Sequence, residues 1–362
     1  MCWCSIFILS NSHFFSVIGS TIKIYSTSSG EVISILPRSH DEGHTDLITS
    51  ATLNVQNSFQ LITASLDGTI KIWDFLEGVL LRTIDLDQPI HRICTHEKVK
   101  DHVFVAAAKK AQTTSEFCCI SIADIADVFT SPTQQHTGGL VVLRVSLKSH
   151  ASGGATKVQK PSQVLFISKT NKTTGLAVSA SGEHLIAVGG YKAYVAKIAA
   201  LTSGFMKFIS PEALTCLAVH PSEDYFATGD VKGVVRLWYC LDSNLIKVVG
   251  VGKKSETCAL HWHAHAVSSV AFTANGAYLL SGGEEAVLVI WQLHTGNREF
   301  IPRVGSPIKS IAVSPPRASE EEYLLGLSDA TYTFVSSTTS KLSRVFAQIR
   351  IGTSIPHDSY PC

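Results

Sequence analysis

Three histidines at alternate positions are the residues of this sequence with the clearest capacity for chemistry. They are His261, His263 and His265. On a β-strand, residues two apart share a face, so three imidazoles could meet one zinc ion. No carboxylate is placed nearby to complete a ligand set, and His263 also lies where one of the repeats described below begins. We therefore interpret His263 as a structural residue and predict no metal site.

Two further segments are similar to catalytic motifs but fail at the positions that carry the chemistry. Residues 250–255 are similar to a phosphate-binding loop, which needs a glycine five residues before its Gly-Lys pair and Ser or Thr after it. Here Lys247 stands at the first position and Lys254 at the last. Ser306 and Lys309 form a Ser-x-x-Lys match without a supporting motif, and there is no Gly-x-Ser-x-Gly elbow. The sequence predicts neither an enzyme nor a bound cofactor.

The composition is that of a neutral globular protein. Of 362 residues, 45% are hydrophobic and 16% are charged, and 30 basic against 29 acidic residues give a formal net charge of +1. The apolar content excludes a disordered chain, and the charge balance argues against a broad basic footprint for nucleic acid. Nine cysteines without a Cys-x-x-Cys pair fit reduced thiols of the cytosol or nucleus. The apolar segment 5–18 is interrupted by polar residues, so we interpret it as strand material and not as a signal peptide or membrane span.

The candidate residues are positioned by a repeat that recurs along the chain. Each copy has apolar residues at period two and ends on an aromatic side chain, with a turn residue six places before it. This is the pattern of a strand that follows a tight turn, and a second strand precedes three of the four clearest copies, so the repeat predicts β-hairpins. The four copies are Gly19–Tyr25, Asp67–Trp73, Lys232–Trp238 and Glu285–Trp291, and a weaker one covers 323–335.

The repeats resemble the WD40 family, whose blades carry Gly-His near the start and Trp-Asp near the end. The clearest copy has these pairs at residues 43–44 and 73–74. Because a four-stranded blade has little core of its own, a buried and satisfied polar chain would fix its turn against the third strand. We assign the hydroxyl of this chain to Ser65, with Thr63 as the alternative. The resemblance implies a hydrogen-bonded tetrad of His44, Asp67, Trp73 and that hydroxyl.

The other copies depart from this pattern. Lys232 and Glu285 occupy the turn position that Asp67 has in the clearest copy. One complete tetrad is therefore expected, and the remaining blades should depend on apolar packing. The residues expected to anchor those blades are Trp238, His263, Trp291 and Asp329.

The spacing of the repeats predicts an all-β fold, a seven-bladed WD40 propeller with an incomplete first blade and divergent ends. Steps between successive aromatic ends suit a period of about 40–45 residues plus insertions, and the long gap between Trp73 and Trp238 holds two further blades. Residues 130–160 should form a long exposed loop. The first blade has too few residues for four full strands, so imperfect ring closure is expected. The blades are expected at about 6–36, 44–87, 88–147, 163–210, 212–260, 262–303 and 305–345, within a propeller of residues 1–345 and before an irregular tail at 346–362.

Below the level of the repeat, the chain resembles the WD repeat-containing protein 75 family. The resemblance rests on departures from the repeat consensus at 260–263 and 281–283 and on the runs 300–305 and 310–315. It implies a non-catalytic scaffold in the nucleus and nucleolus, part of the small-subunit processome that supports pre-rRNA processing and transcription by RNA polymerase I. It also implies other processome proteins with WD40 or helical-repeat folds as partners, an indirect link to pre-rRNA and no membrane contact.

Two other classes of function stay open. A cytoplasmic WD40 adaptor for a ubiquitin ligase or signalling complex would share the fold and the neutral charge. A metal-dependent hydrolase would need the three histidines to hold zinc. The location of the protein in the cell distinguishes the first class, and its metal content distinguishes the second.

Overall fold

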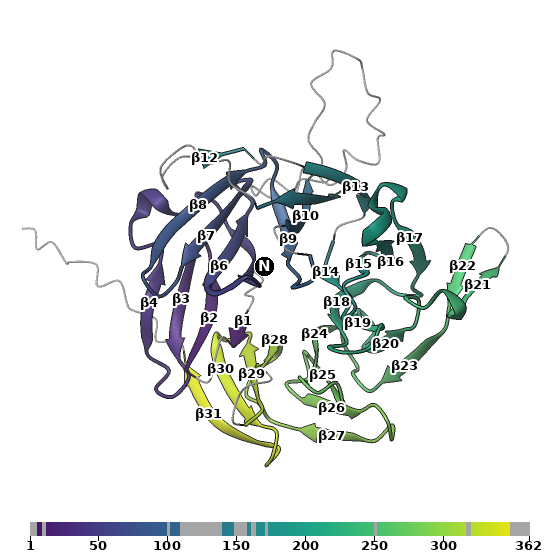
Figure 1. Cartoon of the computed structure of the whole chain (residues 1–362). Coiled ribbons are helices and arrows are strands. Elements are labelled where there is room, and N and C mark those ends of the chain that lie inside the picture. The colour runs from purple at the N-terminus through teal and green to yellow at the C-terminus, as the bar shows by residue number, and fades with distance from the viewer. Residues whose placement is uncertain are drawn as a thin grey trace, which may run out of the picture.

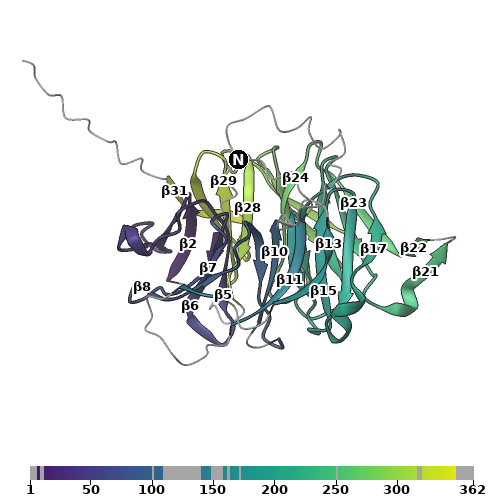
Figure 2. The same cartoon turned by 90° about the horizontal axis from the view of Figure 1, so that it is seen from above.

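The computed structural model is a seven-bladed β-propeller, which confirms the predicted fold (Figure 1). The structure describes residues 6–8, 12–99, 102–108, 140–147, 158–160, 164–170, 173–249, 252–315 and 320–347. Each blade has four antiparallel strands, and the blades stand around a central axis with the first strand of each innermost (Figures 1 and 2). Within the described ranges, no helix has the length and apolar character needed to cross a membrane.

The first three blades come from the N-terminal half of the chain. Blade 1 contains β1 (Ile6–Ile8), β2 (His13–Ile18), β3 (Thr21–Ser26) and β4 (Val32–Leu36). Blade 2 contains β5 (Ile48–Asn54), β6 (Asn57–Ser65), β7 (Thr69–Asp74) and β8 (Val79–Asp85). Blade 3 contains β9 (Ile90–Cys94), β10 (His102–Ala108), β11 (Leu140–Ser146) and β13 (Val164–Thr170).

The remaining four blades follow in chain order. Blade 4 contains β14 (Gly175–Val178), β15 (His184–Gly189), β16 (Lys192–Lys197) and β17 (Met206–Ile209). Blade 5 contains β18 (Leu214–Val219), β19 (Phe226–Asp230), β20 (Val234–Trp238) and β23 (Thr257–His261). Blade 6 contains β24 (Val267–Phe272), β25 (Tyr278–Gly283), β26 (Leu288–Gln292) and β27 (Arg298–Ile301), and blade 7 contains β28 (Ile308–Val313), β29 (Glu322–Leu327), β30 (Thr331–Ser336) and β31 (Lys341–Ala347).

Short elements decorate this ring. β12 (Val158–Gln159) pairs in parallel with β8 and adds a fifth strand to blade 2. β21 (Ile246–Val249) and β22 (Gly252–Ser255) form a hairpin that projects from blade 5 (Figure 1). The segment similar to a phosphate-binding loop is therefore largely strand, and Gly250 and Val251 lie outside the described residues. The described 3₁₀ helices are η1 (His40–Glu42), η3 (Ile198–Ser203) and η4 (Ser243–Leu245).

The core lies between the blades, because each sheet covers the faces of its neighbours. Between blades 2 and 3, for example, Ile62, Ile70 and Ile84 pack with Ile93 and Val105 in one buried cluster. Both faces of the second and third strands are therefore apolar, and this explains why these strands are more uniformly hydrophobic than a strand with one wet face.

The third blade extends further along the chain than the sequence predicted. Val164–Thr170 was expected to open the fourth blade, but β13 pairs with β11 and completes the third. Leu140–Ser146, inside the expected loop 130–160, is strand β11, and its Val142 is fully buried. A long insertion between β10 and β11 interrupts the repeat period here, so the spacing argument misplaced the boundary.

The first blade is incomplete in a narrower sense than predicted. It has four strands, and the described part of its innermost strand β1 is three residues long, which pair with Phe14, Phe15 and Ser16 of β2. All four strands of blade 7 come from its own segment, so the described parts of the first and last blades share no strand. Of the tail expected at 346–362, residues 346 and 347 belong to β31 and 348–362 lie outside the described residues.

Aromatic side chains join the first and last blades instead. The Phe14 ring centre lies 5.3 Å from that of Tyr332 and 5.6 Å from that of Phe334. Tyr25 stacks on Phe14 at 4.9 Å, and the hydroxyls of Ser16 and Tyr332 form a hydrogen bond across the junction. Edge-to-face aromatic pairs add to the apolar area that they bury. The ring is therefore closed by packing.

Candidate functional site

In blade 2, His44 lies at the centre of a buried polar chain. Its Nδ1 atom is 3.0 Å from Asp67 Oδ2, and its Nε2 atom is 2.7 Å from Thr63 Oγ1. The Trp73 indole N–H donates to the same Thr63 oxygen at 3.0 Å. Since a carboxylate can only accept, a neutral His44 donates through Nδ1–H and accepts the Thr63 hydroxyl proton at Nε2. This chain ties the loop before β5 to the β6–β7 turn and to the third strand.

Ser65 is not the hydroxyl of this chain, so our assignment was wrong and Thr63 has the role. The Ser65 hydroxyl donates to the carbonyl of Asp46 at 3.0 Å and accepts the N–H of Asp67 at 3.1 Å. The strand register explains the difference. Leu61 lies opposite Trp73, which makes Thr63 the diagonal neighbour that the indole reaches.

The Asp67 carboxylate is held in its charged form. Burial opposes its ionisation, but hydrogen bonds from His44 and Thr69 outweigh burial and lower its pKa to about 2. Burial also lowers the pKa of His44, although Asp67 favours the protonated imidazole. At pH 7 Asp67 is thus a carboxylate and His44 a neutral imidazole, and the hydrogen bonds of the polar chain form without protonation of His44.

A second chain of the same kind lies in blade 6, where the sequence predicted only apolar packing. His263 Nδ1 is 3.1 Å from Glu285 Oε2, and its Nε2 is 2.8 Å from Ser281 Oγ. The Trp291 indole N–H donates to Ser281 at 2.8 Å. Glutamate thus replaces the turn aspartate, and the expectation of a single tetrad was wrong. The available signal was a hydroxyl residue ten places before the tryptophan in both blades.

The three alternating histidines do not converge on one point. Both ring nitrogens of His263 are taken by Glu285 and Ser281, while the side chain of His265 is 63% exposed and its Nδ1 lies 3.4 Å from Glu285 Oε1. A carboxylate does lie at this place, contrary to the sequence analysis, but it binds the histidines directly. Burial lowers the pKa of His263 even though Glu285 opposes this. In the part of the chain that the structure describes, no group of three His, Cys, Asp or Glu side chains could hold a metal ion.

The other two predicted anchors, Trp238 and Asp329, form hydrogen bonds that include no histidine. The Trp238 indole donates to Thr228 Oγ1 at 2.8 Å, but Ser210 occupies the place of the histidine, and its buried hydroxyl has no hydrogen-bond partner. Asp329 accepts the Ser306 hydroxyl at 2.8 Å and the N–H of Thr331 at 3.0 Å. Neither contact extends into a histidine–tryptophan chain.

Hydroxyls on the innermost strands join neighbouring blades, and the sequence analysis missed them. Thr49 donates to the carbonyl of Ile90 at 2.7 Å, and Thr174 donates to that of Leu214 at 3.1 Å. In the same way, the Thr215 hydroxyl donates to the carbonyl of Val267, and the Ser268 hydroxyl donates to that of Ile308, each on the innermost strand of the next blade. The signal was a Ser or Thr at the start of the inner strands of blades 2, 4, 5 and 6. In blade 7 the equivalent residue is Lys309, so the series ends before the closing junction.

In blade 3 the position of these hydroxyls is held by His91, and the link to the neighbouring blades comes from the next residue, Arg92. Its guanidinium donates to the carbonyl of Thr49 at 2.8 Å and to that of Thr174 at 3.2 Å. This partly buried side chain therefore links blades 2, 3 and 4.

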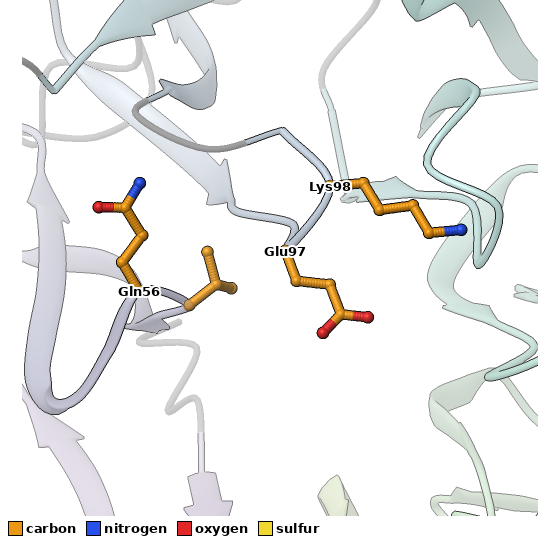
Figure 3. A pocket seen from close by; sticks show the side chains of 4 residues that line it. Gln56, Glu97 and Lys98 are labelled. Carbon is orange, nitrogen blue, oxygen red and sulfur yellow. The ribbon is translucent and has the colours of Figure 1, made fainter.

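A surface hollow of about 730 Å³ lies at the opposite end of the strands from His44 (Figure 3). Val55 and Gln56 come from the β5–β6 turn, and Glu97 and Lys98 come from the segment between β9 and β10. The Lys98 ammonium donates to the carbonyl of Ser181 at 2.9 Å, so it is held against blade 4. One carboxylate and one occupied amine do not make an acid–base pair, and the hollow offers no catalytic arrangement.

Comparison with known proteins identifies the family. A family model described as the first β-propeller of WD repeat-containing protein 75 matches residues 6–320. The chain belongs to this family. WD repeat-containing protein 75 of Homo sapiens is 32% identical over 312 residues, which is 86% of this chain and 34% of that protein. The Xenopus laevis protein is 32% identical over 317 residues, again 86% of this chain. The chain thus spans about a third of the length of these curated relatives.

Two more distant matches add to this picture. U3 small nucleolar RNA-associated protein 17 of Schizosaccharomyces pombe is 50% identical over 70 residues, which is 19% of this chain and 8% of that protein. Among solved structures, the β-propeller domain of Myceliophteria thermophila Cps50 (Swd1) superposes with a TM-score of 0.62 over 91% of this chain and 93% of that chain. At 15% identity this second likeness shows the fold alone.

Proposed function

We propose that this chain is a non-catalytic protein scaffold in ribosome biogenesis. The observation that carries the proposal is membership of the WD repeat-containing protein 75 family over residues 6–320. The Schizosaccharomyces pombe relative is named for its association with U3 small nucleolar RNA, and this supports the same process. A place in the nucleus follows from this role, and in finer detail we propose the nucleolus.

The finer proposal is a subunit of the small-subunit processome that supports pre-rRNA processing and transcription by RNA polymerase I. Its support is the family resemblance and the fold, since a propeller offers rims and edges to other chains. The partners proposed are other processome proteins with WD40 or helical-repeat folds. The contact with pre-rRNA is indirect, because the net charge of +1 supplies no excess of cations for a phosphate backbone.

The polar clusters of the structure support the non-catalytic part of this proposal. His44 and His263 have the neighbours that general bases have in enzymes, a carboxylate on one nitrogen and a hydroxyl on the other. In both chains, however, that hydroxyl accepts a tryptophan N–H and is buried. A nucleophile must be reachable by substrate, so the burial of these hydroxyls supports a structural role in fixing the turns of their blades.

Affinity purification of the tagged full chain from cells, followed by quantitative mass spectrometry, tests the proposal. Enrichment of processome proteins over an unrelated propeller of similar size is the expected result. Recovery of ubiquitin-ligase or signalling subunits without processome proteins would favour the cytoplasmic adaptor and overturn the proposal. Fluorescence microscopy of the same tagged chain should show nuclear signal concentrated in nucleoli.

A further inference from the structure

The outer edge of blade 1 is an apolar strand. β4 is the last strand of its sheet and contains no charged residue. Val32, Ile33 and Ile35 in this strand are 44%, 55% and 42% exposed. An edge strand presents unpaired backbone N–H and C=O groups, and proteins normally protect such edges with charges, bulges or a covering segment.

Blade 2 shows how this propeller covers an edge of the same construction. Its outer strand β8 accepts β12 as a parallel neighbour at Thr83 and Ile84. Both outer strands have a register shift at the same place, which skips Leu81 in β8 and Ile33 in β4. A bulge at this position does not prevent the addition of a strand. In β8 the bulge is at Leu81, and β12 pairs with Thr83 and Ile84, which lie beyond it.

The uncovered edge differs from the covered one in exposure. Ile35 and Leu36 of β4 correspond in register to Thr83 and Ile84 of β8. Thr83, beneath β12, is 5% exposed, whereas Ile35 is 42% exposed. In the described residues, nothing pairs with the outer side of β4. An isoleucine that occupies the place of a covered threonine indicates that an apolar segment covers this edge as well.

The other outer strands are protected in the ordinary way. β23 of blade 5 carries no Lys, Arg, Asp or Glu, but it exposes no large aliphatic side chain either. The outer strands of blades 4, 6 and 7 contain charged residues, namely Lys207, Arg298, Glu299, Lys341 and Arg344. β13 of blade 3 also contains a charged residue, Lys169. Ile209 of β17 and Val345 of β31 are exposed too, but only β4 among the described outer strands combines exposed aliphatic side chains with the absence of any charged residue.

We propose that β4 binds an extended segment of a partner protein, which joins blade 1 as an added parallel strand with aliphatic side chains at alternate positions. Main-chain hydrogen bonds supply affinity in this mode of recognition, and side-chain chemistry supplies specificity. Exposed Glu31 precedes β4 and exposed Arg38 follows it. A parallel partner segment begins beside Glu31 and ends beside Arg38. Charge complementarity therefore predicts basic residues at its start and acidic residues at its end. The proposal rests on the scaffold function above only in assigning the segment to another protein of the same assembly.

A synthetic peptide serves as the probe. It has ten residues with Val or Ile at alternate positions, Thr between them, Lys-Lys at the N-terminus and Asp-Asp at the C-terminus, and its binding to the full chain is measured by fluorescence anisotropy. Saturable binding is expected, at least tenfold tighter than that of the same peptide with its terminal charges exchanged. A third peptide, N-methylated at alternate backbone nitrogens, should lose binding because it cannot pair as a strand.

Matched variants locate the binding surface. The double variant Ile33→Lys and Ile35→Lys should weaken binding at least tenfold without a change in thermal midpoint, since both side chains are exposed. Val345→Lys, at a 56% exposed position on the outer strand of blade 7, should bind the peptide like the unaltered chain. Hydrogen exchange of the peptide complex should show slower exchange within residues 32–36.

Several results would overturn the proposal. One is equal affinity for the double variant, for the N-methylated peptide or for the charge-exchanged peptide. Another is self-association that the double variant abolishes, which would assign the edge to a second copy of this chain. A third is binding that appears only after residues 348–362 are removed, which would assign it to the chain's own tail. The peptide result is independent of the purification from cells, so failure of this proposal and failure of the proposed function are distinguishable.

Discussion

The junction between blades 6 and 7 and the junction between blades 7 and 1 are built differently. At the first, the Ser268 hydroxyl donates to the carbonyl of Ile308, and the Ser269 hydroxyl accepts the N–H of Ile311 at 3.0 Å, so both inner strands are tied through their backbones. At the second, aromatic rings around Phe14 and Tyr332 pack together, and the hydroxyls of Ser16 and Tyr332 form a hydrogen bond. The first junction is thus held by hydrogen bonds between side-chain hydroxyls of β24 and the main chain of β28. Among the described residues, the second junction is held mainly by large side chains further out.

The blades also differ in whether their interiors contain a buried polar chain. Blades 2 and 6 contain the histidine chains that end on Trp73 and Trp291. In blade 7 the positions of hydroxyl, acid and tryptophan are held by Leu325, Asp329 and Val335, so no such chain forms. The two blades that meet at the closing junction are therefore held mainly by apolar packing, and the middle of the ring combines packing with buried polar chains.

Truncation of a tryptophan at the end of a polar chain should have the largest effect. Trp73→Ala removes a fully buried ring and leaves the buried Thr63 oxygen without the N–H that it accepts. We therefore expect the free energy of unfolding to fall by about 3–5 kcal/mol. Trp291→Ala should cost a similar amount. Trp238→Ala should cost less, because Trp238 donates to Thr228 without a histidine behind it. Urea midpoints measure these losses, and a Trp73→Ala shift no larger than that of the exposed Ser28→Ala would contradict the role of the chain.

Removal of the central hydroxyl should come next. Thr63→Val keeps the shape of the side chain but leaves the His44 imidazole and the Trp73 indole without their shared partner, at a cost of about 2–4 kcal/mol. Ser281→Ala in blade 6 should have an effect in the same range. Ser65→Ala is the matched control, because Ser65 lies outside the chain, and it should cost about 1 kcal/mol. Equal losses for Thr63→Val and Ser65→Ala, measured by urea unfolding, would mean that the chain adds nothing beyond local bonds.

Acidification should destabilise the middle blades in two steps. The pKa of His44 and that of His263 are lowered by burial, so below about pH 6.5 the unfolded chain binds protons that the folded chain does not, and stability falls. A second loss is expected between pH 3.8 and about 2, where Asp67 is protonated only in the unfolded chain.

Urea midpoints from pH 8 to about pH 2 measure both steps. The variant Asp67→Asn should show a smaller lower step, because its side chain does not titrate, while Glu285, whose pKa is also lowered, still contributes. A midpoint that stays constant from pH 7 to pH 5 would mean that neither histidine is held in its neutral form.

Single hydroxyls at the two junctions should have the smallest effects. Ser268→Ala between blades 6 and 7 and Tyr332→Phe between blades 7 and 1 each remove one hydrogen bond, worth about 1 kcal/mol. If both junctions are independent, the double variant should lose the sum of the two values. A clear departure from additivity in urea unfolding would show that closure of the ring couples distant blades.

The fold and one polar chain could be predicted because they depend on local repetition. Strands at period two, the turn residue before each aromatic and the pair at residues 43–44 are readable within one blade. The blade 6 chain was missed because glutamate stood where aspartate was expected, although its longer side chain reaches His263 as well. The hydroxyl was misassigned because Thr63 and Ser65 share a strand face, and only the register with Trp73 separates them.

Features that join distant parts of the chain could not be predicted. Ser16 and Tyr332 are 316 residues apart, and no spacing argument places them in contact. The boundary of the third blade was wrong because the insertion before Leu140 breaks the period on which the boundaries were based. The apolar edge of β4 was visible as composition, but its exposure follows only from its outermost place in the sheet.

Native-state hydrogen exchange compares the two kinds of junction most directly. Opening of the strands at the closing junction, at Phe14–Val17 and Thr331–Phe334, should require less free energy than opening of Leu61–Ser65 and Ile70–Trp73 in blade 2, so their amides should exchange faster at low denaturant. Equal protection of all four segments, at the level of global unfolding, would contradict this. It would mean that aromatic packing closes the ring as firmly as the polar chains hold its middle.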